Sequence, residues 1–141
     1  MKISTDSDTF YKITENSPVL YLQEILITSD VYKFGKHQYF KIRINEKYIK
    51  QIENIEKEIS NLLDKDIITQ LYVNNQLGYM TVKIPIYIDK INILNNSQLK
   101  TVLDITKNSI VDLKISFNTL YNKKNRIQYR WNLHEIAFEK K

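Results

Sequence analysis

Every second residue is apolar in several separate stretches of this chain, and this two-residue period restricts the fold more than any other feature of the sequence. Residues 38–44, 79–88 and 111–117 all show it. Successive side chains of a β-strand point to opposite sides of the sheet, so each stretch is predicted to be a strand with one buried face. Residues 19–28 are rich in Ile, Leu and Tyr and predict a further, buried strand.

One segment has a helical period instead. Apolar residues recur at mostly three- or four-residue intervals from Tyr48 to Leu62, which predicts an amphipathic helix near residues 46–64. Asn45 can cap its start, because a side-chain oxygen there accepts a backbone N–H of the first turn. Residues 98–105 fit a short helix or a strand, and both remain open. Together these elements predict an α+β fold, mainly β, in one domain.

The N-terminal residues carry neither period. Residues 1–16 are polar, and we expect them to be a flexible leader before a single domain at 17–141. No apolar run approaches the roughly 20 residues that span a bilayer, and the polar N-terminus lacks a secretory signal. The chain contains no cysteine, which fits a reducing compartment. We therefore expect an intracellular protein without a membrane partner, in the host cytoplasm or nucleus if its source is viral.

Positive charge is concentrated in two parts of the chain. The net charge is +5, yet residues 31–50 hold six basic groups against one acidic group. Residues 67–141 hold eleven basic groups against five acidic ones, whereas residues 51–66 are acidic. Such blocks predict a surface that binds a polyanion, with lysines on an ordinary solvated surface as the alternative.

The residue patterns typical of enzymes are missing. The two histidines have no metal-binding spacing, and two glycines are too few for a phosphate-binding loop. The nearest paired carboxylates, Asp64 with Asp66 and Asp104 with Asp112, fit solvated or turn positions better than a Mg²⁺ site. The sequence predicts a binding protein rather than an enzyme, with no catalytic residue, no cofactor and no metal ion.

An aromatic and basic hairpin over residues 117–131 is the clearest functional feature. Phosphates need positive charge and unpaired bases need flat rings to stack on. The candidate phosphate contacts are Lys123, Lys124, Arg126 and Arg130, and the candidate stacking rings are Tyr121, Tyr129 and Trp131.

The last strand, predicted over 126–138, divides this set between two faces. Alternation places Arg126, Gln128 and Arg130 outward and aligns Trp131 with the apolar Ile127. Trp131 therefore fits the core somewhat better than a binding groove, and both positions remain open. Near residues 134–135 the apolar positions change phase, which predicts a bulge.

Two more predicted strand faces interleave aromatic and basic residues. One belongs to an early hairpin that turns at Gly35, and it carries Tyr32, Lys33, Lys36, Tyr39, Lys41 and Arg43. The other lies on the strand over 79–88, and it carries Tyr79, Thr81, Lys83 and Tyr87. Pro85 cannot donate to a strand ladder, so this strand is predicted to lie at a sheet edge or to be interrupted there. A short strand over 67–73 and a turn at 74–78 precede it.

The order of these elements resembles a known family. The strand Val82-Lys83-Ile84-Pro85, the strand Val111-Asp112-Leu113-Lys114-Ile115 and the segment Tyr129-Arg130-Trp131-Asn132-Leu133 carry the resemblance. From Tyr79 onward, over about the last 60 residues, the chain is similar to OB-fold single-stranded DNA-binding proteins of large DNA viruses, phages and linear plasmids.

The resemblance implies an OB-like, partly open barrel of about five to seven strands. In that family, aromatic and basic groups on a concave face cover single strands during replication. Many such proteins end in an acidic tail that recruits partners, whereas this sequence ends in Glu139-Lys140-Lys141.

The sequence thus favours a sequence-tolerant protein that binds single-stranded DNA in genome replication. RNA cannot be separated from DNA at this level, and self-association is a further expected partnership. The alternative is a protein-interaction or structural assembly subunit of a virus or phage that binds no nucleic acid, because protein interfaces also favour Tyr, Trp and Arg.

Overall fold

The computed structural model describes residues 1–86, 92–94 and 104–138. Outside them lie Tyr87, the end of the strand predicted over 79–88 and residues 98–103 of the segment for which a helix and a strand remain open. In chain order the described elements are β1 (Lys2–Thr5), β2 (Phe10–Glu15), β3 (Val19–Ile27), β4 (Tyr32–Phe34), β5 (His37–Ile44), α1 (Glu46–Leu63), β6 (Tyr72–Asn74), β7 (Leu77–Ile84), β8 (Asn92–Leu94), β9 (Ile110–Ser116), β10 (Thr119–Lys123), β11 (Arg126–Gln128) and β12 (Trp131–Phe138).

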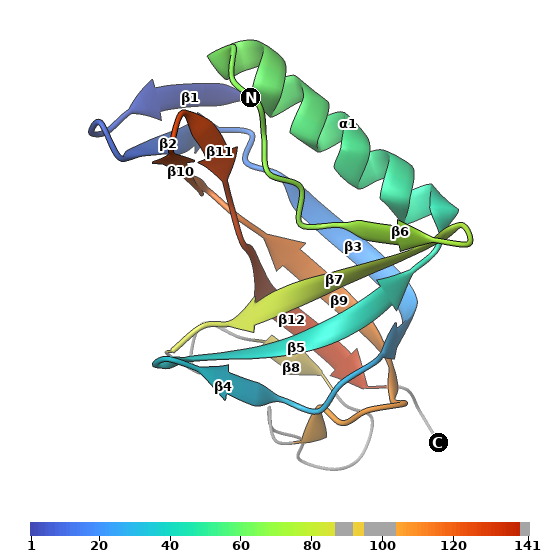
Figure 1. Ribbon diagram of the computed structural model, residues 1–141. Helices are drawn as coiled ribbons and strands as arrows, with labels where there is room; N and C mark the ends of the chain where they lie inside the picture. The colour runs from blue at the N-terminus through green and yellow to red at the C-terminus, as the bar shows by residue number, and fades with distance from the viewer. Residues whose placement is uncertain (87–91, 95–103, 139–141) are drawn as a thin grey trace.

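Five strands close into a barrel. β3 pairs with β5 and β9, β9 pairs with β12, β12 pairs with β7, and β7 returns to β5. Only the β12–β7 pairing in this ring is parallel. Figure 1 shows β5 and β7 crossing the front of the barrel below α1. The mainly β, OB-like prediction is confirmed, but the ring is closed rather than partly open, because β5 and β7 pair along almost their whole length.

The alternating residues fill this barrel as predicted. Phe40 and Ile42 on β5, Val82 on β7 and Ile115 on β9 are completely buried. Their neighbours in sequence are exposed or half-buried, so each strand has one face in the core and one outside. Each fully buried side chain of this size contributes about 1.5–3 kcal/mol to the hydrophobic stabilisation.

The predicted helix is α1, and Asn45 caps it. The Asn45 side chain accepts a hydrogen bond from the Tyr48 N–H at 3.4 Å. Ile52 and Ile59 are buried, which confirms the apolar stripe. Leu62 is the exception, because the helix is about to end there and leaves this side chain exposed. No helix among the described residues combines the length and apolar character that a membrane crossing requires.

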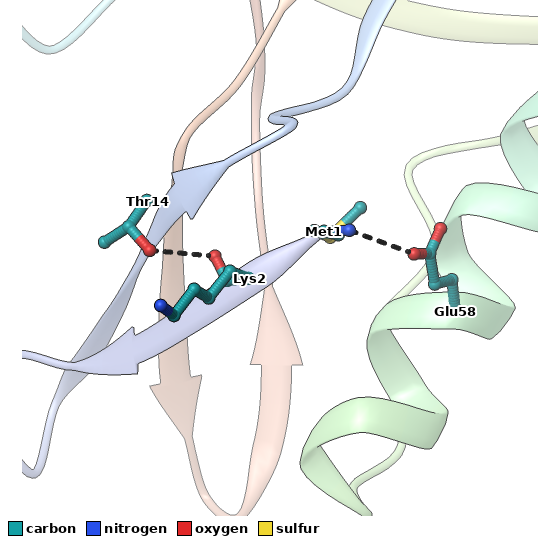
Figure 2. Close-up of polar contacts among 4 residues, drawn as sticks. All are labelled: Met1, Lys2, Thr14 and Glu58. Carbon is teal, nitrogen blue, oxygen red and sulfur yellow. Dashed lines mark hydrogen bonds and ion pairs between the residues drawn. The ribbon is translucent and has the colours of Figure 1, made fainter.

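Residues 1–16 are not the loose leader that the sequence predicts. They contribute β1 and β2 to a second sheet, of order β1-β2-β10-β11. Ile13 is buried, and its N–H donates to the carbonyl of Asn118 at 2.8 Å. The Met1 amino group lies 3.7 Å from the Glu58 carboxylate of α1, and the Thr14 hydroxyl donates to the Lys2 carbonyl (Figure 2). Pairing with distant strands therefore orders a segment that has little apolar pattern of its own.

Two local predictions need correction, and two others are confirmed. Of the strand predicted over 67–73, only the last two residues lie in a strand, β6. Earlier in this segment the Ile68 N–H donates to the Ile127 carbonyl and no regular strand forms. β7 ends just before Pro85 and has strands on both sides, so of the two predicted alternatives the interruption at Pro85 is confirmed and the edge position is not. The last strand is broken into β11 and β12, which leaves Arg130 between them. The bulge predicted near residue 134 is confirmed by a register shift between Leu133 and Glu135.

Candidate nucleic-acid interface

Two of the three aromatic and basic faces predicted from the sequence meet on one surface. β5 and β7 are paired so that Tyr39 lies opposite Lys83, Lys41 opposite Thr81, and Arg43 opposite Tyr79. Residues directly opposite each other in a sheet point to the same side. That side is the outside of the barrel, because the intervening residues of both strands are buried.

Short flanking strands widen this surface with two more tyrosines. Tyr32 of β4 lies opposite Tyr39, and their rings are stacked with centroids 5.9 Å apart. Tyr72 of β6 lies opposite Tyr79, with ring centroids 6.2 Å apart. We call this outward surface the β5–β7 face, and its members are Tyr32, Tyr39, Lys41, Arg43, Tyr72, Tyr79, Thr81 and Lys83.

The β5–β7 face is positively charged without acidic neighbours on its own strands. β4, β5, β6 and β7 contain no Asp or Glu. The Lys41 ammonium lies 5.8 Å from the centre of the Tyr32 ring, so charge and aromatic surface are adjacent. Burial, together with the charges of Arg130 and Lys36, lowers the pKa of Lys83. The arrangement can attract phosphates and offer rings to unpaired bases at the same time.

Arg130 lies beside this face rather than on the hairpin with which the sequence groups it. The next residue, Trp131, is paired with Val82 of β7, which places Arg130 beside the outward residues of that strand. Its guanidinium is exposed, and Nη1 donates to the Gln70 side-chain oxygen at 3.1 Å.

The part of the predicted 117–131 hairpin that forms β10 and β11 lies on the second sheet. Tyr121 is opposite Gln128, and Lys123 is opposite Arg126, on β10 and β11. All of Tyr121, Lys123, Lys124 and Arg126 are exposed. Figure 1 places β10 and β11 beside β1 and β2, away from the part of β5 and β7 that crosses the front of the barrel. The aromatic and basic surface of β10 and β11 is therefore separate from the β5–β7 face.

Tyr129 and Trp131 need correction as candidate stacking residues, because both are buried. Their exposed fractions are 0% and 1%. The centroid of the Phe117 ring lies 4.4 Å from the centroid of the Tyr129 ring and 4.7 Å from that of Trp131. The Tyr129 hydroxyl donates to the Glu56 carboxylate of α1 at 2.6 Å. Burial and the nearby charge of Glu56 raise the pKa of Tyr129. Both rings are therefore packed in the core, against Phe117 and against each other.

Sequence reasoning missed Tyr72, which belongs to the β5–β7 face, and His37, which lies beside it. Tyr72 could have been found from the turn at 74–78, because a hairpin about that turn brings Tyr72 opposite Tyr79. His37 begins β5, and its ring contacts Tyr39 edge-on with centroids 6.5 Å apart. Tyr87, which the sequence also proposes, lies outside the described residues.

Two solved structures have a similar fold. The single-stranded DNA-binding protein gp2.5 encoded by bacteriophage T7 superposes with a TM-score of 0.61 and 11% identity, over 87% of this chain and 86% of that one. The chain shares its fold with phage proteins. A C-terminally truncated single-stranded DNA-binding protein from bacteriophage Enc34 gives a TM-score of 0.57 and 11% identity, over 99% of this chain and 95% of that one. No protein-family model and no curated protein matches the sequence.

The shared fold confirms the resemblance that the sequence suggested, and extends it. The sequence pattern carried the likeness over about the last 60 residues, whereas the structural match covers most of the chain. The additional part contains β3 and β5, without which the barrel could not close.

Proposed function

We propose that this protein binds single-stranded DNA with little sequence preference, and that it does so inside the cell during genome replication. The observation that carries the proposal is the β5–β7 face, where four tyrosines are interleaved with Lys41, Arg43 and Lys83. The two phage proteins with a similar fold are both named as single-stranded DNA-binding proteins, which supports the same assignment.

The place of this face in the barrel also supports binding there. OB-folds bind oligonucleotides on the face formed by their second and third strands and on the adjoining loops. β5 and β7 are the second and third strands of this barrel in chain order, and β4 and β6 belong to the segments that join the barrel strands. Ring stacking and phosphate contacts do not distinguish one base from another, so this surface favours binding without sequence preference.

The separate basic surface on β10 and β11 extends the proposal. Tyr121, Lys123, Lys124 and Arg126 would contact a strand that continues beyond the β5–β7 face. A contact of this kind adds affinity only for oligonucleotides long enough to reach both sheets.

The test compares matched tyrosine and lysine variants in oligo-dT binding. Tyr79→Ala and Lys41→Gln remove groups from the β5–β7 face. Tyr21→Ala and Lys114→Gln are controls, because the exposed Tyr21 of β3 and the half-buried Lys114 of β9 form a similar pair, with the ammonium 5.4 Å from the ring centre, away from the β5–β7 face. One lost stack of about 1–3 kcal/mol corresponds to a loss of about 5-fold to 150-fold in affinity for Tyr79→Ala. Equal losses in Tyr21→Ala would show that the β5–β7 face is not the binding site, and oligo-U in parallel separates DNA from RNA.

The second candidate function is binding of a protein partner, and exposed apolar side chains favour it. Phe34 is 77% exposed at the β4–β5 turn, and Val73 is 51% exposed on β6. Neither is needed for phosphate contacts, and both could contact a protein partner. Nuclease treatment of a captured complex separates the two functions, since a partner held only through DNA is released by it.

A further inference from the structure

Three basic side chains and a histidine converge at one end of the β5–β7 face. Lys83 lies opposite Tyr39, and His37 stands two residues before Tyr39 on the same side of β5. Lys36 precedes His37 in the β4–β5 turn, and Arg130 approaches β7 from the β12 side. We call Lys36, His37, Lys83 and Arg130 the Lys83 cluster.

The Lys83 cluster is not neutralised within the described residues. The ion pairs in that part of the chain join Met1 to Glu58, Lys2 to Glu15 and Lys50 to Glu46, and none includes a member of the cluster. Arg130 instead bonds to the uncharged Gln70 amide. The charges that act most strongly on Lys83 are the two cations Arg130 and Lys36. Like charges held together in this way favour binding of an anion.

His37 provides a second, independent sign of a missing ligand. Its Nδ1 atom is buried and has no hydrogen-bond partner among the described residues. Such an atom is costly unless a ligand or water satisfies it. The groups that face the ring are Lys36 from its own turn, Lys83 from β7 and the ring of Tyr39. Partial burial and these two lysines lower the pKa of His37.

We propose that the Lys83 cluster holds a single phosphodiester group of the bound strand, and that His37 takes up a proton from solvent when this phosphate arrives. The inference rests on the proposed function and adds the position and chemistry of one contact. Arg130 can donate two parallel hydrogen bonds to the phosphate oxygens, whereas Lys36 and Lys83 act as point charges.

The proposal predicts that affinity depends on pH. In the free protein burial and the neighbouring cations favour the neutral imidazole, and a phosphate beside it raises the pKa of His37. Binding therefore takes up a proton, and oligo-dT affinity should rise several-fold between about pH 8 and about pH 5.5. His37→Gln should lose this rise, so that its oligo-dT affinity no longer increases between about pH 8 and about pH 5.5, whatever its affinity at high pH.

Salt dependence tests whether the cluster holds one phosphate or several. Each phosphate neutralised on a single strand contributes about 0.7 to the slope of log affinity against log salt. Lys83→Gln combined with Arg130→Gln should reduce the slope by about 0.7, because both residues contact the same phosphate. A reduction near 1.4 would overturn the single-phosphate proposal in favour of two independent contacts. Lys114→Gln is the control and should leave the slope unchanged.

Proton NMR of the histidine ring distinguishes this proposal from the proposed function itself. The His37 signals are assigned by their loss in His37→Gln, and their titration is followed with no ligand, with oligo-dT and with inorganic phosphate. A higher pKa of His37 with oligo-dT supports the proposal. Oligo-dT binding without that change overturns the phosphate contact alone, as does a response to inorganic phosphate but not to oligo-dT. Absence of oligo-dT binding by the parent protein overturns the proposed function.

Discussion

Replacing Tyr129 by Phe should destabilise the protein by about 2 kcal/mol, because hydrogen bonds to charged groups contribute about 1.5–3 kcal/mol. The lost bond is the 2.6 Å contact from the Tyr129 hydroxyl to Glu56, and both side chains are buried. The Gln70 N–H still donates to the same carboxylate oxygen at 3.4 Å, so the carboxylate retains one weak donor. That remaining donor keeps the expected cost near the middle of the range.

Urea unfolding monitored by the fluorescence of Trp131, the single tryptophan, measures this cost. A loss of about 2 kcal/mol lowers the Tm by about 4–8 °C for a chain of this size. Tyr48→Phe is the matched control, because its hydroxyl accepts from the backbone N–H of Gln23 at 2.9 Å in a neutral bond worth about 1 kcal/mol. The reasoning is refuted if Tyr129→Phe costs less than Tyr48→Phe, or if its effect adds fully to that of Glu56→Gln.

The ionisation of the Tyr129 hydroxyl should make the stability of the protein depend on pH in the alkaline range. The pKa of Tyr129 is raised in the folded protein, whereas tyrosines of the unfolded chain titrate near about 10. Its contribution is therefore fully present below about pH 10 and is lost as the pH rises above that value. Tyr129→Phe should lose less stability than the parent protein over this alkaline range.

Three further predictions concern a cap, a glycine and the second basic surface. Asn45→Ala removes the helix cap and should cost about 1 kcal/mol by thermal unfolding. Gly78→Ala would bring its Cβ within 2.9 Å of Ile44 and should cost about 1–3 kcal/mol, whereas Gly35→Ala meets no atom within 4 Å and should cost only about 1 kcal/mol for its positive φ. Arg126→Glu should weaken binding of long oligo-dT more than binding of short oligo-dT. Equal losses at both lengths in fluorescence anisotropy would contradict an extended path.

Much of the barrel could be predicted because its strands carry their own signal. Each barrel strand has one buried and one outward face, so the apolar residues of β5, β7 and β9 alternate and report both the strand and its orientation. The cap at Asn45 and the bulge after Leu133 are also local features. For the same reason the outward positions of Tyr39, Lys41 and Lys83 were predictable before any pairing was known.

The second sheet could not be predicted, because its order depends on distant partners. β1 and β2 are largely polar, and only a few residues such as Ile3 and Ile13 pack against the core. β2 is held by β10, more than a hundred residues away in the sequence. The sequence also could not tell that β5 and β7 would be neighbours while the β10–β11 hairpin would join another sheet. Alternation assigns faces within a strand but does not order the strands.

A salt titration of oligo-dT binding by the unmodified protein tests the central claim most directly. Lys41, Arg43 and the Lys83 cluster offer three phosphate contacts on or beside the β5–β7 face, and the β10–β11 surface offers further contacts to a long oligo-dT. Our account predicts measurable binding at low salt, and log affinity that falls linearly with log salt with a slope of about −2 to −3. Absence of binding at low salt, or an affinity that salt leaves unchanged, would contradict it.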